Sequence, residues 1–298
     1  MFPADEQHLT LAVPSATGDG ARLGESVGAA VDDTLAAAGA WCPVSLVPFP
    51  DGTTGRFPHI IERGKPGIIG ALADGRRFCN EGNGYYDYVD AMLRAVPAGQ
   101  EVASWLICTR AFQRRYGLGI TRPAPLSVEP YIKSGYIKAG RTIAELARNA
   151  GIDPQGLERT VSEYNLHALK GEDPAFGRGS TLYNRYQGDA SNKPNPCVAP
   201  IAQGPFYAVK VMPGSFGTFA GLKTDASARV LGAGGAPIEG LYAVGTDMAS
   251  VMGGHYPAGG INLGPAMTFG YIAGRHAAGA TGYEDESKAA HTKRGPKG

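Results

Sequence analysis

The sequence predicts an α+β protein with two domains, and three observations support this fold class. The length of 298 residues exceeds the ~150 residues of a typical single domain. Strand-like apolar runs gather at residues 41–72 and 205–245, whereas helical spacing is frequent between them. Glycine supplies 44 residues, spread through apolar segments rather than in a collagen-like period or a polar tract, so we expect tight turns in a globular chain.

The net charge and the cysteines exclude several classes of protein and site. Lys and Arg number 28 and Asp and Glu 27, with no block of like charges, so we expect neither nucleic acid nor an anionic membrane as a partner. Cys42, Cys79, Cys108 and Cys197 lie far apart without the spacing of a zinc site, so we predict reduced thiols and no metal. A signal-peptide pattern and an apolar segment of ~18 residues are both missing, so we expect a soluble cytoplasmic protein.

The first elements follow from the spacing of apolar residues. After the turn PSATGDG, the segment ARLGESVGAAVDDTLAAAGA carries apolar residues at three- and four-residue steps, which predicts an amphipathic helix over residues 21–40. From Trp41 the pattern changes to the short strand-like runs PVSLVPF and GIIGALA. A domain boundary near Pro48 is therefore expected.

The middle of the chain is predicted to be mainly helical. The spacing predicts helices at residues 85–95 and 101–115, an extended segment at 128–136 and a long surface loop at 171–200 that could border a site. Two further helices have clear boundaries: Thr142 caps the first, Gly151 ends it, and Asp153-Pro154 begins the next.

The last third returns to strand-like runs, PFYAVKV, ARVLG and GLYAVG. The segment 240–279 predicts a buried strand that ends in glycine, a glycine-rich loop, and a helix beginning near Asn262. The first N–H groups of such a helix have no intrahelical partner, so they can receive a phosphate or a carbonyl oxygen that becomes anionic. On the residues alone, a purely structural strand–turn–helix remains the alternative.

This segment contains SVMGGHYPAGGINLGPAMTFGY, which resembles the C-terminal FAD-binding signature of the fumarate reductase and 3-ketosteroid dehydrogenase flavoprotein superfamily (FAD-binding type 2). Three further segments agree in order: ATGDG at 16–20, GRRFCNE at 75–81 and GPFYAVKVMPGSFGTFAGLKTD at 204–225. The form is closest to the 3-ketosteroid dehydrogenase-like branch. The resemblance implies an FAD-dependent oxidoreductase acting on CH–CH groups, which removes hydrogen from a C–C bond next to a carbonyl and passes a hydride to the flavin.

The resemblance also implies how the domains are arranged. A capping (substrate) domain, residues 48–205, is inserted between two segments of an FAD-binding domain, residues 1–47 and 206–283, and residues 284–298 form a flexible tail. The family's G-x-G-x-x-G unit is not found, because the nearest glycines, at 18–24, have the wrong spacing. We therefore expect the C-terminal part of a longer flavoprotein with an incomplete FAD-binding domain. A separate N-terminal FAD-domain chain is a candidate partner.

By the same resemblance, six residues would contact FAD: Thr17 and Asp19 in the TGDG turn, Gly245 and Thr246 after the strand, and Asn262 and Leu263 at the helix start. Family members often carry Glu or Asn where Thr246 stands, and Asp247 is a candidate replacement. Thr218 and Gly221 are expected to pack near the flavin ring, since glycine permits close backbone approach.

The resemblance implies three catalytic positions. Tyr85, which follows Asn80-Glu81 at a better spacing than Tyr86, is the base that removes the substrate proton. Tyr256 and the backbone N–H of Gly260 polarise the substrate carbonyl, because the C–H bond is acidic only if the developing enolate is stabilised. A phenol that acts as a base also needs a lowered pKa or a relay. An ordinary aromatic role at a domain interface is the alternative for both tyrosines.

The substrate is expected to be a small-molecule ketone, either a steroid or another bulky cyclic ketone, and the electron acceptor is unknown. A fumarate reductase or succinate dehydrogenase-like carboxylate oxidoreductase is the alternative within enzymes, but an arginine would then be expected before the last helix, where Tyr256-Pro257 stands. A catalytically incompetent truncated product is the alternative of a different class. His255, beside Tyr256, could assist proton transfer or be structural.

Overall fold

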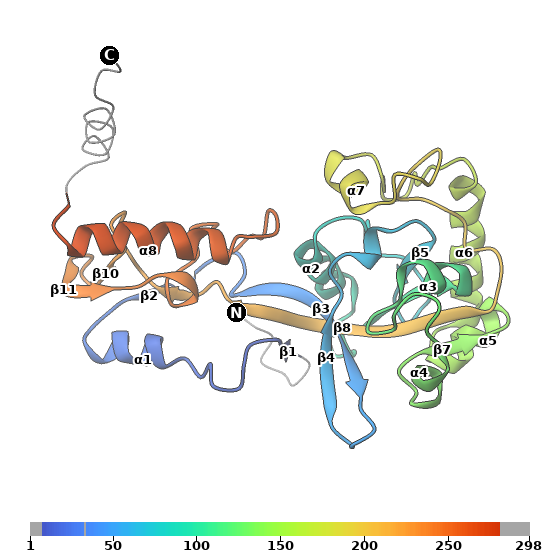
Figure 1. Ribbon diagram of the computed structural model, residues 1–298, viewed down its shortest axis with the longest axis horizontal. Coiled ribbons are helices and arrows are strands. Elements are labelled where there is room, and N and C mark those ends of the chain that lie inside the picture. The colour runs from blue at the N-terminus through green and yellow to red at the C-terminus, as the bar shows by residue number, and fades with distance from the viewer. Residues whose placement is uncertain (1–7, 33, 281–298) are drawn as a thin grey trace, which may run out of the picture. The chain divides into compact units, whose positions relative to one another are not determined.

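The computed structural model describes residues 8–32 and 34–280, and these form two compact units (Figure 1). Of the described residues, unit 1 comprises 13–32, 34–39 and 218–280, and unit 2 comprises 8–12 and 40–217. The predicted tail at 284–298 lies outside the described residues. Within the described part of the chain, no helix has the length and apolar character needed to cross a membrane.

Unit 2 is built on a sheet whose central strand is β8 (Phe206–Thr218), the long arrow in Figure 1. The other strands are β1 (Leu9–Thr10), β3 (Gly39–Pro48), β4 (Thr54–Pro58), β5 (Ile68–Ala71), β6 (Ser104–Thr109) and β7 (Lys138–Gly140). The order is β4-β3-β8-β6-β5, and β1 and β7 also pair with β8. β1 runs parallel to β8, whereas β6 and β7 run antiparallel to it.

Helices cover both faces of this sheet. Successive residues of a strand point to opposite faces, so neighbouring residues contact different helices. The helical elements are η1 (Glu62–Gly64), α2 (Tyr85–Ala95), α3 (Arg110–Tyr116), α4 (Glu129–Lys133), α5 (Ile143–Ala150), α6 (Pro154–Ala168) and α7 (Leu182–Gln187). Ile107 of β6 packs with Leu146 and Leu157 of α5 and α6 on one face. Its neighbour Leu106 packs with Tyr88 of α2 and Phe112 of α3 on the other.

The two helices with clear sequence boundaries are confirmed. The Thr142 hydroxyl accepts a hydrogen bond from the Glu145 N–H at 3.1 Å, and Gly151 ends α5 with φ 75°. The Asp153 carboxylate accepts from the N–H groups of Gln155 and Gly156 at the start of α6. Local capping therefore decides these boundaries.

Three other predictions in unit 2 were wrong. The helix predicted at 101–115 is a strand over Ser104–Thr109, and only Arg110–Tyr116 is helical, because β6 is buried between β5 and β8. The segment predicted as extended contains the helix α4. The long loop at 171–200 contains α7, whose N-cap Thr181 accepts from the Asn184 N–H at 3.1 Å.

Unit 1 contains short strands and two helices. Its elements are α1 (Asp19–Ser26), β2 (Val31–Asp32), β9 (Gly221–Leu222), β10 (Arg229–Leu231), β11 (Pro237–Tyr242), η2 (Gly245–Asp247) and α8 (Leu263–Ala277). β2 pairs with β9, and β10 pairs with β11, both antiparallel. α8 lies beside β11 (Figure 1), and the Tyr242 hydroxyl and His276 Nδ1 are 2.7 Å apart. Its apolar core is formed by Leu222, Val230, Ala243 and Met248.

In unit 1, the prediction of a helix over residues 21–40 was wrong, since α1 ends at Ser26. Gly28 has φ 83°, a conformation that stops a helix, and Val31 then pairs with Leu222 of β9. The strand of the 240–279 segment was expected to be buried, but every residue of β11 is partly or fully exposed. The helix expected near Asn262 is confirmed as α8. The mixture of helices and strands is confirmed as well, whereas the inserted capping domain stays a prediction.

Candidate functional site

Tyr85 is the first residue of α2 and is buried to 8% exposure in unit 2. Its ring meets that of Phe216, near the end of β8, edge to face at 5.4 Å between centroids. The neighbouring Tyr86 is equally buried, and burial raises the pKa of its phenol. The candidate base therefore stands where a helix begins, packed against the central strand.

The turn before α2 is fixed by side-chain amides. The side-chain oxygen Oδ1 of Asn80 accepts from the Gly82 N–H at 2.9 Å, and the side-chain amide nitrogen of Asn80 donates to Asn184 Oδ1 at 3.0 Å. The Asn184 amide in turn donates to Asn83 Oδ1 at 2.9 Å. Burial raises the pKa of Asp87, and a hydrogen bond from the backbone of Gly84, the helix N-cap, partly opposes this rise. Both ends of the turn are thus tied down.

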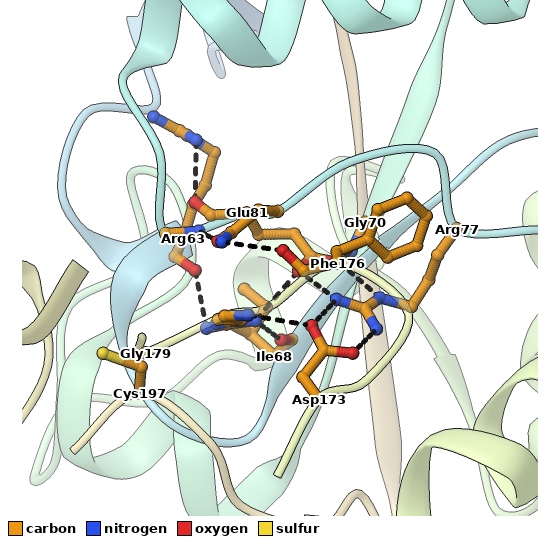
Figure 2. Close-up of polar contacts among 12 residues, drawn as sticks. Arg63, Ile68, Gly70, Arg77, Glu81, Asp173, Phe176, Gly179 and Cys197 are labelled. Carbon is orange, nitrogen blue, oxygen red and sulfur yellow. Dashed lines mark hydrogen bonds and ion pairs between the residues drawn. The ribbon is translucent and has the colours of Figure 1, made fainter. Parts of the chain in front are cut away.

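Glu81, in the same turn, is a fully buried carboxylate (Figure 2). It accepts hydrogen bonds from Arg77 at 2.8 and 2.6 Å, from Arg178 at 3.2 Å and from the Gly70 N–H at 3.0 Å. Burial by itself would raise the pKa of Glu81, but the charges and hydrogen bonds of Arg77 and Arg178 hold it below its usual value. The carboxylate is therefore ionised at neutral pH.

Arg77 joins this carboxylate to a second one. Figure 2 shows Glu81 and Asp173 on two sides of its guanidinium, and Asp173 accepts at 2.7 and 2.9 Å. The rings of Tyr164 and Phe176 lie 5.0 and 4.9 Å from the guanidinium carbon. Because its donors are directed to Glu81 and Asp173, Arg77 braces the loop rather than offering a free cation to a ligand.

In unit 1, the residues predicted to contact FAD come from two segments that lie together. The Thr17 hydroxyl donates to the Asp19 carboxylate at 3.1 Å, and Arg22 also binds Asp19. A Cβ added to Gly20 would lie 2.6 Å from the Asp247 carboxylate. The TGDG turn therefore lies directly against η2, the element that follows the strand.

The glycine-rich segment presents a hollow beside the start of α8. Thr218, Gly245, Thr246, Asn262 and Pro265 are among the residues that line it. Thr218 donates its hydroxyl to the Thr246 carbonyl at 3.4 Å. The side chain of Asn262 makes no capping hydrogen bond at the helix N-cap. The helix N-terminus can therefore receive an anionic or carbonyl oxygen of a ligand.

The remaining predicted positions of unit 1 have distinct surroundings. Leu263 is 72% exposed at the first position of α8. Gly221 lies close to the backbone of residues 247–249, since an added Cβ would lie 2.7 Å from the Asp247 carbonyl oxygen. Tyr256 is buried, with its ring 6.0 Å from that of Phe219.

Gly260 is exposed and has φ 100°, a backbone conformation that favours glycine. The N–H of His255 donates to the Met252 carbonyl at 3.2 Å. Tyr256 and Gly260 belong to unit 1, and Tyr85 belongs to unit 2.

Sequence reasoning missed Arg63, Asp173, Arg178 and Asn184 of the buried network. The last three lie in the 171–200 segment, which was expected to border a site, so its composition was a usable signal. The pairing itself carried no local signal, because the Arg77–Asp173 bond joins residues 96 positions apart.

The residues of unit 1 fit FAD in chemical type. An α-helix N-terminus without a side-chain cap, a glycine with positive φ before it, and hydroxyl groups beside it are suited to phosphate or flavin oxygens.

Comparison with known proteins gives a family. A profile described as FAD binding domain matches residues 1–263. The 4-oxocyclohex-2-ene-1-carboxylate 5-dehydrogenase of Sinomonas cyclohexanicum is 41% identical over 93% of this chain and 47% of that protein. The 3-oxosteroid 1-dehydrogenase of Mycobacterium tuberculosis (strain ATCC 25618 / H37Rv) is 37% identical over 92% of this chain and 48% of that protein.

A solved structure agrees with these relatives. The 3-ketosteroid delta1-dehydrogenase from Sterolibacterium denitrificans, in complex with 1,4-androstadiene-3,17-dione, matches with a TM-score of 0.85 and 36% identity, over 94% of this chain and 50% of that one. The chain thus spans about half the length of the relatives it matches. FAD is the cofactor of the matched family, as the four ordered motifs predicted. The chain belongs to the FAD-binding domain family of flavoproteins.

Proposed function

We propose that this chain takes part in the FAD-dependent oxidation of a C–C bond beside the carbonyl group of a cyclic ketone. The observation that carries the proposal is the position of Tyr85, a candidate base at a helix start whose preceding turn is fixed by a buried network. The named relatives support the substrate class, because a 3-oxosteroid and a 4-oxocyclohexene carboxylate share a ketone in a six-membered ring.

In the proposed reaction, the phenolic oxygen of Tyr85 takes a proton from the carbon beside the carbonyl. Tyr256 and the Gly260 N–H donate hydrogen bonds to the carbonyl oxygen, which stabilises the enolate that develops. FAD, when bound, supplies the acceptor for the hydride that leaves the neighbouring carbon. One proton and one hydride leave the substrate, which balances the new C=C bond.

The same proposal assigns the cofactor residues and the domains. Thr17, Asp19, Gly245, Thr246, Asn262 and Leu263 would hold FAD. Residues 1–47 and 206–283 would belong to the FAD-binding domain, and residues 48–205 to the capping domain. A separate N-terminal FAD-domain chain is part of the proposal as a partner. An acceptor that reoxidises the flavin completes the turnover.

The first test is retention of FAD. The purified chain is mixed with FAD, excess FAD is removed, and flavin absorbance per protein is measured. Retention near one per chain would show that the residues of this chain suffice to hold FAD. The matched variant is Gly260→Val, which places a branched side chain at a positive-φ position before α8 and should reduce retention, whereas Gly99→Val, at a positive φ in a loop of unit 2, should leave it unchanged. Equal retention in both variants would contradict the assignment of FAD to this segment.

The second test is anaerobic bleaching of the retained flavin by a ketone. A 3-oxosteroid and 4-oxocyclohexanecarboxylate are compared, with succinate as the probe for the carboxylate alternative. Bleaching by a ketone is expected, and Tyr85→Phe should slow it by roughly 10²–10⁴-fold, the range for loss of a general base. Bleaching by succinate alone would favour the fumarate reductase-like alternative. Flavin that is retained but bleached by none of the three would indicate the catalytically incompetent product.

A further inference from the structure

Arg63 is a buried arginine whose guanidinium donates to backbone carbonyls of the turn before α2. Its side chain donates to Glu81 O at 2.9 Å and to Asn83 O at 3.4 Å, and it also binds His59 O at 3.0 Å. The carbon of the same guanidinium lies 4.9 Å from the ring centroid of Tyr88, one helical turn after Tyr85. A single side chain from η1 therefore contacts both the turn and the helix that carry the candidate base.

Asn184 contacts the turn from another element, at the start of α7. It is fully buried, and its amide donates to Asn83 Oδ1 at 2.9 Å. Its side-chain oxygen Oδ1 accepts from the side-chain amide of Asn80 and from the Gly179 N–H, each at 3.0 Å. Gly82 packs closely against the side chains of Asn80 and Asn184. A Cβ added there would lie 3.2 Å from Asn80 Oδ1 and 3.3 Å from Asn184 Cγ.

Arg63 and Asn184 meet the turn through different groups, so their effects can be separated. Arg63 binds main-chain carbonyl oxygens, whereas Asn184 binds side-chain amides. The remainder of the network, around Glu81, ties the turn to the sheet through the Gly70 N–H of β5. Contacts from η1, α7 and β5 therefore fix the position of the turn, and with it the position of the first residue of α2.

We propose that Arg63 and Asn184 are positioning residues that fix Tyr85 by clamping the turn at 80–84, from which α2 begins. The inference rests on the proposed role of Tyr85 and adds two residues that do not belong to the motif-derived site. A displacement of about 1 Å in a catalytic group can cost roughly 100-fold in rate, so such clamps are expected behind a base.

The test measures the surroundings of Tyr85 without cofactor or substrate. The full chain is labelled with 3-fluorotyrosine, and Tyr85→Phe assigns the Tyr85 signal in the ¹⁹F spectrum. We expect Arg63→Gln and Asn184→Ala to shift and broaden this signal. Arg63→Lys keeps the charge without the directed fork of donors, so its shift should be smaller than that of Arg63→Gln.

Two control variants repeat the substitutions Arg→Gln and Asn→Ala at exposed positions away from the turn. Arg94→Gln removes an exposed arginine of the same helix, where Arg94 pairs with Asp90. Asn149→Ala removes an exposed asparagine whose amide binds the Ala139 carbonyl in the same unit. Neither should move the Tyr85 signal.

A merely stabilising role for Arg63 and Asn184 would lower Tm and leave the Tyr85 signal unchanged in the folded protein. That result in Arg63→Gln and Asn184→Ala would overturn the proposal. If either variant fails to fold, Arg63→Lys and Asn184→Asp decide the outcome by the same signal. The test is independent of the proposed function: bleaching that survives Tyr85→Phe would contradict the role of Tyr85 as base, while a shifted Tyr85 signal would still support the clamp.

Discussion

Glu81 shows at the scale of one residue what a buried charge requires. Its carboxylate is 0% exposed, and two guanidinium groups and a backbone N–H direct hydrogen bonds to it. Removing one partner from such a pair leaves the other charge buried without compensation, and this costs more than the pair itself contributes. Arg178 is the group that would lose its carboxylate partner, whereas Arg77 keeps Asp173.

Glu81→Gln is therefore predicted to lower the free energy of unfolding by about 3–5 kcal/mol at pH 7, the range measured for broken buried pairs. Denaturant unfolding followed by circular dichroism measures it. The control is Glu101→Gln, since Glu101 is half exposed and pairs with Lys210. An exposed pair contributes at most about 1 kcal/mol, so equal effects of the two substitutions would contradict the prediction.

The effect of the same substitution on the free energy of unfolding should depend on pH. The pKa of Glu81 is lower in the folded than in the unfolded protein, so its contribution is present above the usual carboxyl pKa and is lost as pH falls through the folded value. Below pH ~4, the gap in unfolding free energy between the native chain and Glu81→Gln should therefore narrow. A gap that stays constant down to the acid transition would argue against an ionised Glu81.

The residue scale also shows the reach of sequence reasoning. The motif GRRFCNE and the tyrosine after it placed a candidate base at 85, and the structure puts that residue at a helix start. Asp173, Arg178 and Asn184 could not be paired with the motif, because a hydrogen bond between positions about a hundred residues apart leaves no local pattern.

At the scale of one element, two side chains form the N-terminal cap of α5. Thr142 accepts from the Glu145 N–H at 3.1 Å, and the Glu145 carboxylate accepts from the Arg141 N–H at 2.9 Å. Two N–H groups at the helix start thus gain partners. The buried side of α5 carries Leu146 and Ala147 into the core of unit 2.

Thr142→Ala is predicted to lower the free energy of unfolding by about 0.5–2 kcal/mol, because it removes the acceptor for the Glu145 N–H. Thermal or denaturant unfolding measures the change. Thr142→Ser keeps the hydroxyl and should stay within a few tenths of a kcal/mol of the native chain. A Ser variant as unstable as the Ala variant would show that the methyl group, not the cap, stabilises the helix.

Elements with such local signals were predicted, and elements decided by distant pairing were not. The caps of α5 and α6 are within the sequence they delimit. By contrast, the run SWLICT at 104–109 has the apolar content of a buried helix or a buried strand, and only its pairing with β5 and β8 makes it a strand. The helix predicted to 40 stopped at 26 for the same reason, since β2 pairs with β9.

At the scale of the whole molecule, the two units differ in how much apolar structure they bury. Unit 2 has two clusters on the faces of one sheet, whereas the core cluster of unit 1 contains Leu222, Val230, Ala243 and Met248. Every residue of α8 is at least partly exposed. Local opening is governed by such contacts, so the units should differ in the stability of their backbone hydrogen bonds.

Amide hydrogen exchange is predicted to be slowest in β6 and β8 and at least roughly tenfold faster in α8 of the unliganded chain. Exchange followed by mass spectrometry measures it segment by segment. Addition of FAD should slow exchange at residues 245–247 and 262–266 and leave α5 unchanged as the internal control. Slowing in α5 without slowing near Asn262 would place the cofactor elsewhere.

The position of β8 in the chain has a consequence for synthesis on the ribosome. All of its partner strands, β1, β3, β6 and β7, lie within residues 9–140, whereas β8 begins at residue 206. At ~5–20 residues per second, β6 is complete for roughly 5–20 s before its neighbour is made. During that time one edge of a buried strand has no protein partner, and such edges aggregate. Translation speed across residues 110–205 and access to a chaperone should therefore govern the yield of folded chain more than the stability of the finished sheet does.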